Sequence, residues 1–194
     1  MTPHAPLFES IFDQFVQSYI DQSTPANQGL LTYFDKDWMS PCIKSDDVVN
    51  KANEDLVPWQ PFSRAGEANL SNIEEALSIK IPQELQYLFC AYYSHDLNAH
   101  ADDGNFTILQ AWNEYDFDRL QKNLIAHVLM KRRLKQADTL FFAITDEEDI
   151  VLSIDIATGA VVVERVGKEP HKTVAVNLSE FINLISPAPA LVEL

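Results

Sequence analysis

Two histidines and several carboxylates occur close together between residues 95 and 105, and side chains of these types can bind zinc or manganese. His95, His100 and Asp102 would be the ligands of a metal-dependent hydrolase. Their spacing matches no strong metal motif, and His, Asp, Asn and Gly are also the usual residues of a solvated turn. We therefore favour a turn, and no bound metal, with the hydrolase kept as an alternative.

Carboxylates are concentrated in two further places. Asp146, Glu147, Glu148 and Asp149 are consecutive, and they could receive a basic ligand, although the D-x-D-x-D-G spacing of a calcium loop is absent. Between residues 102 and 118 five acids occur without a base, and between 119 and 135 six bases follow without an acid. Clustered carboxylates repel one another, so a surface that keeps them can use their field for recognition. These stretches favour a binding role.

Other motifs give little support for catalysis. His127 lies within a predicted helix, where we expect a partly buried histidine that is hydrogen-bonded to a backbone or carboxylate group. Cys42 and Cys90 have no C-x-x-C partner, so we expect packing residues in a reducing compartment. The chain has no G-x-S-x-G motif, P-loop or G-x-G-x-x-G motif. The sequence predicts no enzyme and no cofactor.

The overall charge limits the partners. The 194 residues include 29 Asp and Glu against 14 Lys and Arg, which gives a formal net charge of -15. This charge repels nucleic acids and anionic lipid headgroups and attracts basic protein surfaces. The N-terminus lacks a basic region of the signal-peptide type, and no apolar run approaches the roughly 18 residues of a membrane span. We expect a cytoplasmic protein that binds neither nucleic acid nor the lipid interior.

Hydrophobic periodicity indicates which elements position these residues. Apolar residues recur at helical spacing over 7–20, and the proline-rich and glycine-containing region that follows, up to residue 70, predicts a long ordered coil. Its Trp38, Trp59 and Phe62 are expected to pack against the core. Ser71 and Glu74 have the spacing of a capping box, and Pro82 begins another helix.

The rest of the chain predicts a sheet and two more helices. A strand over 106–112 enters a long helix with acids in its first turns, bases in its last turn and Phe117, Leu120, Leu124 and Val128 on its core side. Asn177 and Glu180 cap a final helix that reaches Ile185. Three strands between the two helices complete the pattern: 139–145, 150–156 and 160–166.

This order predicts an α+β fold. We expect a single domain over 1–194, with a central, mostly antiparallel sheet of about four to six strands packed against helices. Residues 1–70 would form the N-terminal helix and coil, 71–187 the core and 188–194 a tail.

Several segments are similar to those of a known bacterial family. They are Ser40-Pro41-Cys42-Ile43, Trp59-Gln60-Pro61-Phe62, the stretch from Leu109 to His127, Lys131-Arg132-Arg133-Leu134-Lys135 and Thr139-Leu140-Phe141. Together they resemble the Syd family of SecY-interacting proteins, whose fold is similar to the SUKH superfamily of mostly binding modules. The resemblance extends from the first helix to Pro187. Residues 28–36 and 188–194 look less like the family, which leaves open whether an extra element shapes the binding site.

The resemblance implies a cytosolic, non-catalytic protein that associates peripherally with the cytoplasmic face of the inner membrane. It would bind basic cytosolic loops of the SecY translocon subunit through an acidic concave surface, and would check or modulate SecYEG assembly. The acids that match the family best are Glu114, Asp116, Glu147 and Glu148. Asp96, Asp102, Asp103, Asp118 and Asp149 are the further candidates for this surface.

Charge considerations agree with this implication and leave one alternative open. Cytoplasmic loops of membrane proteins are enriched in Lys and Arg, so an acidic protein that lipid repels can still dock on them. An immunity-type module of the SUKH superfamily, which would neutralise a basic toxin, requires the same charge. The sequence does not separate these two partners.

Overall fold

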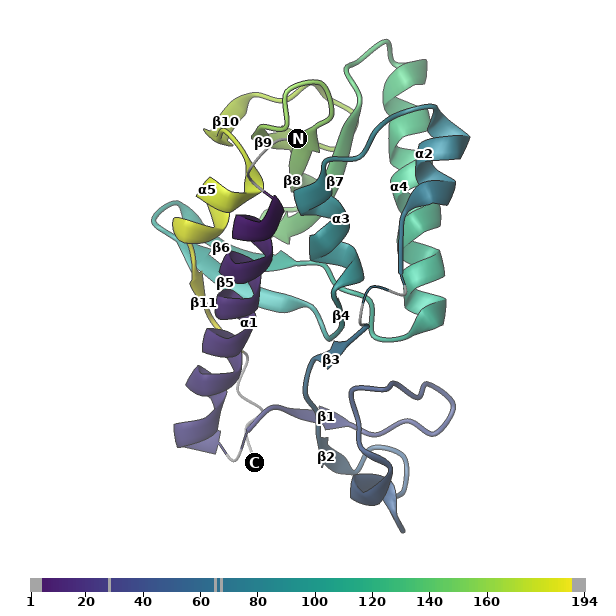
Figure 1. Ribbon diagram of the computed structural model, residues 1–194, viewed down its shortest axis with the longest axis vertical. Coiled ribbons are helices and arrows are strands. Elements are labelled where there is room, and N and C mark those ends of the chain that lie inside the picture. Colours follow the sequence, from purple (N-terminus) through teal and green to yellow (C-terminus); the bar gives the residue numbers. More distant parts are fainter. Residues whose placement is uncertain (1–4, 28, 65, 67, 190–194) are drawn as a thin grey trace.

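A seven-stranded antiparallel sheet forms the centre of the fold in the computed structural model, which describes residues 5–27, 29–64, 66 and 68–189 (Figure 1). The strands are arranged in the order β10-β9-β8-β7-β6-β5-β11, and each pairs antiparallel with its neighbours. They are β5 (Leu97–Ala101), β6 (Gly104–Ile108), β7 (Thr139–Thr145), β8 (Ile150–Asp155), β9 (Val161–Arg165), β10 (Lys172–Ala175) and β11 (Ser186–Pro187).

The α+β prediction is confirmed, but the sheet has more strands than the four to six expected. The region over 95–105 is mostly strand and only briefly turn. Leu97 and Ala99 of β5 alternate with more exposed residues, and β5 pairs with β6 along its whole length. Its polar residues conceal this alternation in the sequence. β6 is also shorter than predicted, since it ends at Ile108.

Two helices cover opposite faces of the sheet (Figure 1). On one face, His127 of α4 (Glu114–Arg133) contacts Phe141 of β7. On the other face, Phe181 of α5 (Leu178–Asn183) contacts Phe106 and Phe142. The side chains of Val163 and Glu164 follow the same division, because consecutive residues of a strand point to opposite faces.

α1 (Ala5–Asn27) lies beside α5 and α3 (Gln83–Cys90), and α2 (Ser71–Leu77) lies beside α4. α1 extends beyond the predicted range of 7–20. Its Phe12 packs against the ring of Tyr87, and Asp13 accepts hydrogen bonds from the hydroxyls of Tyr87 and Tyr92 at 2.9 and 2.8 Å. One helix is thus fixed by both apolar and polar contacts.

The predicted helix caps have mixed outcomes. The side chain of Asn177 accepts a hydrogen bond from the amide of Glu180 at 2.8 Å, which confirms the cap of α5, although this helix ends at Asn183. The capping box at Ser71 is wrong, because the Ser71 hydroxyl donates to Asn69. The carboxylate of Glu74 instead accepts from the amide of Ile81 at 2.9 Å, so it stabilises the chain after α2.

A buried polar cluster joins α4 to the sheet. Glu164 and Lys131 are fully buried and form an ion pair, and Glu164 also accepts hydrogen bonds from Thr139 and Ser153 at 2.7 and 2.6 Å. His127 is buried with Nε2 3.3 Å from the same carboxylate, as expected for a hydrogen-bonded histidine. Burial alone would raise the pKa of Glu164, but hydrogen bonds from these partners lower it to about 2. The carboxylate is therefore held ionised inside the protein.

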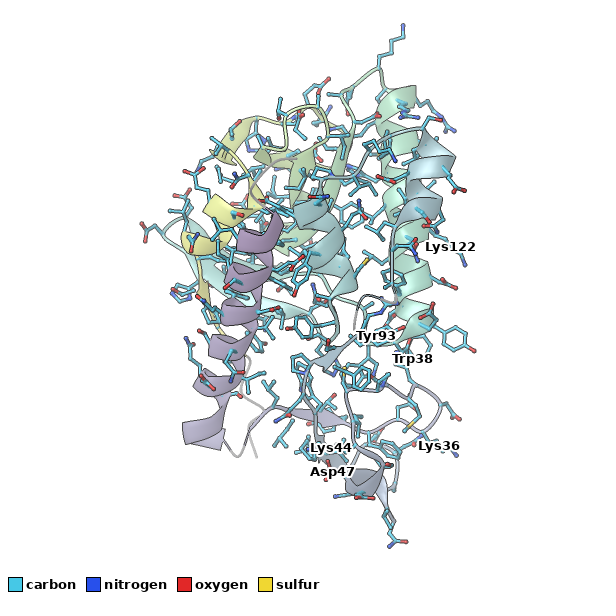
Figure 2. All side chains as sticks on the ribbon, viewed as in Figure 1. Lys36, Trp38, Lys44, Asp47, Tyr93 and Lys122 are labelled. Atoms are coloured by element: carbon cyan, nitrogen blue, oxygen red, sulfur yellow. The ribbon has the colours of Figure 1, made fainter. Side chains whose placement is uncertain are left out.

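The predicted coil contains short elements of its own. β1 (Leu31–Tyr33) pairs with β2 (Leu56–Pro58), a 3-10 helix spans Ser45–Val48, and β3 (Phe62–Ser63) pairs with β4 (Tyr92–Tyr93). Trp59 is buried as expected, whereas Trp38 and Phe62 are exposed. Trp38 lies near the first turn of α4 (Figure 2). Residues 28 and 190–194, which belong to the two less family-like segments, lie outside the described residues.

Candidate functional site

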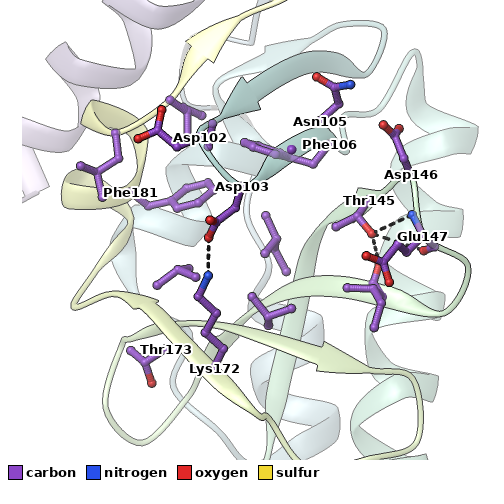
Figure 3. Close-up of a pocket in the computed structure, with 18 of the residues that line it drawn as sticks. Asp102, Asp103, Asn105, Phe106, Thr145, Asp146, Glu147, Lys172, Thr173 and Phe181 are labelled. Atoms are coloured by element: carbon purple, nitrogen blue, oxygen red, sulfur yellow. Dashed lines mark hydrogen bonds and ion pairs between the residues drawn. The ribbon is translucent and has the colours of Figure 1, made fainter.

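An acid-rimmed cavity of about 720 Å³ lies on the face of the sheet that α5 partly covers (Figure 3). One part of its rim is the turn between β5 and β6, and a second part is the turn between β7 and β8. Residues of β8, β9, β10 and α5 complete it. We call this cavity the acidic pocket and define it by its rim residues Asp102, Asp103, Asp146 and Glu147 and by the apolar floor described below.

Local hydrogen bonds hold the acidic turns in place. Asp102 and Asp103 are the two residues between the paired Ala101 and Gly104, and Gly104 supplies a positive φ of 137° after the turn. In the other turn, the Thr145 hydroxyl accepts a hydrogen bond from the amide of Glu147 at 3.2 Å (Figure 3). The acids therefore lie on short turns between paired strands.

The rim carries more negative charge than its neighbours neutralise. Lys172 of β10 reaches across to Asp103 and forms an ion pair with it (Figure 3). Within the described part of the chain, no cation lies within ion-pair distance of Asp102, Asp146 or Glu147. Carboxylates on adjacent turns reinforce one another's field, and a concave surface focuses it. The rim is suited to bind cations.

The floor of the pocket is apolar. Phe106 and Phe181 are buried with ring centroids 5.5 Å apart, and Leu152 is buried beside them. Leu184, which directly follows α5, lines the same pocket and is exposed. An apolar floor inside a charged rim fits a partner segment with both basic and apolar side chains better than it fits a lone ion.

Comparison with known proteins identifies the family. The model of the family described as Syd protein (SUKH-2) matches residues 9–187. The chain belongs to the Syd family. A Protein Syd from Alteromonas mediterranea is 42% identical over 178 residues, which cover 92% of this chain and 95% of that protein. One from Pseudoalteromonas atlantica is 41% identical, over 84% of this chain and 86% of that protein.

The nine acids predicted for the surface are distributed over both faces of this Syd-family fold. Three of them, Asp102, Asp103 and Glu147, line the acidic pocket. The set of nine acids did not include Asp146, although Asp146 belongs to the acidic run that could receive a basic ligand. Lys172 was not predicted, because its pairing with a distant aspartate has no local sequence signal. Glu148 and Asp149 follow in the same turn without lining the pocket, and Asp149 lies 3.8 Å from Arg165.

Asp96 and Asp116 line a second, smaller cavity of about 210 Å³ beside α4. Arg119 forms an ion pair with Asp116 at 2.7 Å. Desolvation by the surrounding protein raises the pKa of Asp96. The amide of Gln110 donates a hydrogen bond to this carboxylate at 2.7 Å, which acts to lower the pKa. His95 lines the same cavity, and burial lowers its pKa to about 4, so it is neutral near pH 7. In this cavity Asp116 is paired with Arg119, and His95 carries no charge near pH 7.

Glu114 and Asp118 lie on α4 and line neither cavity. Glu114 accepts a hydrogen bond from the Tyr93 hydroxyl and lies 3.6 Å from Arg64, whose guanidinium is stacked between the rings of Tyr93 and Phe117. The charge of Glu114 is therefore already partly compensated.

The metal alternative has no support in the geometry. His95 stacks on Trp112 with ring centroids 3.8 Å apart, and its Nε2 lies 2.9 Å from the Thr32 hydroxyl. His100 is exposed on β5. Among the residues that the structure describes, no group of three or more His, Cys, Asp or Glu side chains could hold a metal ion. No helix in the same residues is long and apolar enough to cross a membrane.

Proposed function

We propose that this Syd-family chain is a non-catalytic binding protein whose acidic pocket docks on basic cytosolic loops of the SecY translocon subunit. It would act in the cytoplasm, at the cytoplasmic face of the inner membrane, without inserting into lipid. Through this docking it would check or modulate SecYEG assembly. The partner follows from the family, and the acidic pocket supports the mode of binding.

The observation that carries the proposal is the three unpaired carboxylates on the rim of the acidic pocket. Asp102, Asp146 and Glu147 present carboxylates around an apolar floor, and none of them has a cation beside it among the described residues. Lys and Arg side chains of a loop would neutralise the rim while an apolar side chain contacts Phe106 and Phe181. Since an exposed ion pair contributes only about 0.2 to 1 kcal/mol, this apolar contact is needed for useful affinity.

The other predicted acids have a smaller role in this proposal. Glu148 and Asp149 would add to the field at the edge of the pocket. Asp96, Glu114, Asp116 and Asp118 are arranged around α4, which packs on the opposite face of the sheet, and Arg64 and Arg119 compensate two of them. The Debye length is about 8 Å at physiological salt, so their field at the pocket is weak.

The test is co-sedimentation of the purified chain with membranes that contain SecY and with membranes depleted of SecY, each at low and high salt. We expect SecY-dependent recovery that falls as salt rises, and its loss in Asp146→Lys/Glu147→Lys. Asp46→Lys/Glu75→Lys changes the net charge equally at exposed residues outside the pocket and serves as the matched control.

Equal recovery with both kinds of membrane would contradict SecY docking. The immunity-type alternative would then be tested against soluble basic proteins with the same two variants. If the control variant loses binding as completely as the pocket variant, net charge rather than the acidic pocket determines docking, and the proposed site is wrong.

A further inference from the structure

Trp38 and Tyr115 form a stacked aromatic pair on the protein surface. Their ring centroids are 5.9 Å apart and the rings are inclined by 30°. Tyr115 is 74% exposed and Trp38 39%, and the neighbouring Met39 is also exposed. We call these three residues the aromatic surface. Large apolar side chains that remain exposed next to one another are typical of a binding site.

The backbone beneath the aromatic surface is firmly held. The indole Nε1 of Trp112 donates to the carbonyl of Trp38 at 3.3 Å, and the side-chain amide of Asn113 donates to the carbonyl of Met39 at 2.9 Å. Asn113 also caps α4, the helix that carries Tyr115. Asn113 thus holds both the backbone next to Trp38 and the start of the helix that carries Tyr115, so little backbone freedom remains to be lost when a partner binds.

Acids outnumber bases around the aromatic surface, because the nearby bases are Lys36 and Arg119, and Arg119 is paired with Asp116. Asp35 and Asp37 precede Trp38 in a turn, where the amide of Trp38 donates to the carbonyl of Asp35 at 3.1 Å. Asp118 follows Tyr115 by three residues and so lies on the same side of α4. None of these three aspartates forms an ion pair with another described residue. Lys36 is the base in the same turn. A cationic ligand complements this arrangement.

We propose that the aromatic surface is a second docking surface, which binds an arginine-bearing segment of a basic partner protein. A guanidinium stacks on aromatic rings and is attracted by their faces, and the flanking aspartates strengthen that attraction. The methylene groups of the same arginine would contact Met39. None of the residues of the aromatic surface lines the acidic pocket, so the proposal goes beyond the function proposed above.

A second copy of the chain is a poor occupant for this surface. Each copy carries a formal charge of -15, so two copies repel one another. A two-fold contact also places the same surface patch on both copies, which would bring Asp35, Asp37 and Asp118 close to their own counterparts. A basic partner avoids both costs.

The experiment uses the whole chain labelled with 5-fluorotryptophan at its three tryptophans and observed by fluorine NMR. Trp38→Phe assigns one of the resonances. The probe is a short synthetic peptide of alternating arginine and leucine with blocked ends. We expect it to shift the Trp38 resonance and to leave those of the buried Trp59 and Trp112 in place.

Variants of Tyr115 test the contact itself. Tyr115→Ala should raise the dissociation constant read at Trp38 by about tenfold or more, as truncation of an aromatic anchor does. Tyr115→Phe keeps the ring face and should retain the affinity, and Asp35→Asn/Asp37→Asn should weaken binding. Leu129→Ala, at another exposed apolar residue of α4, is the matched control and should bind like the unmodified chain.

Three results would overturn the proposal. The first is a failure of the aromatic contact itself, seen as a Trp38 resonance that the peptide leaves unmoved or as unchanged affinity in Tyr115→Ala. The second is a Trp38 shift that appears without peptide as protein concentration rises, because a second copy would then be the occupant. The third is loss of the shift in Asp146→Lys/Glu147→Lys, which would make the effect a consequence of binding in the acidic pocket. Since this readout involves no membrane, failure of SecY docking leaves it interpretable.

Discussion

The two faces of the main sheet use carboxylates in opposite ways. On the α4 face, Glu164 is fully buried and is surrounded by Lys131, His127, Thr139 and Ser153. On the α5 face, the carboxylates of the acidic pocket lie on exposed turns, and only Asp103 has a cationic partner among the described residues. The buried acid is compensated from several sides, whereas the surface acids are not.

Solvation explains the difference. A buried charge without partners would cost several kcal/mol, so the fold can place Glu164 between α4 and the sheet only with a full set of donors. An exposed carboxylate is hydrated and needs no protein partner, which leaves its field available to a ligand. The number of unpaired acids at an exposed site is therefore a better guide to binding than the number of acids in the sequence.

The largest effect is expected when the buried pair is broken. Lys131→Met leaves the Glu164 carboxylate without its cation and should lower the free energy of unfolding by about 3 to 5 kcal/mol, measured by urea denaturation at pH 7. Lys131→Met/Glu164→Gln removes both charges and keeps an acceptor for Thr139 and Ser153. This double variant should be more stable than the single variant. If it is less stable, the ion pair is not what the single substitution disrupts.

The same cluster predicts a pH dependence. Its hydrogen bonds lower the pKa of Glu164 from the ordinary 4.5 to about 2, so the folded state favours the ionised carboxylate. The contribution of the ionised Glu164 to the free energy of unfolding is complete above pH 4.5. It is lost as the pH falls toward 2, by an amount on the order of 3 kcal/mol. We expect Glu164→Gln to lose this part of the acid dependence, measured as the difference between the two unfolding free energies across that pH range. A constant difference would contradict it.

The helices and the three strands from residue 139 to 166 could be predicted from sequence because their apolar residues recur with clear periods. β5 could not, because His100 and the acids of the following turn have the composition of a loop, and its pairing with β6 and β11 is a tertiary property. The cap at Asn177 was predictable, whereas the pattern of Ser71 and Glu74 was misleading. In that segment the Ser71 hydroxyl donates to Asn69, and the Glu74 carboxylate accepts from the amide of Ile81.

The candidate site was predictable in composition rather than in geometry. The acidic runs indicated a binding surface, and three of the nine acids line the pocket. The sequence does not show that β9 turns the side chain of Val163 to the pocket and that of Glu164 to α4. It likewise does not show that Lys172 pairs with Asp103, 69 residues earlier in the chain. Such contacts depend on strand order, which local patterns do not encode.

The smallest effects separate two neighbouring acids of one turn. Glu147 lines the acidic pocket and Glu148 does not, although both are exposed and the sequence predicts both for the surface. Glu147→Lys should therefore weaken salt-sensitive docking on SecY-containing membranes by roughly 1 kcal/mol, about fivefold, and Glu148→Lys by less than half of that energy. Both variants should unfold within about 0.5 kcal/mol of the unmodified chain, since exposed turns tolerate charge reversal. Equal losses of affinity would mean that the partner responds to the summed charge of the turn, and that the geometry of the pocket contributes little to the choice between the two.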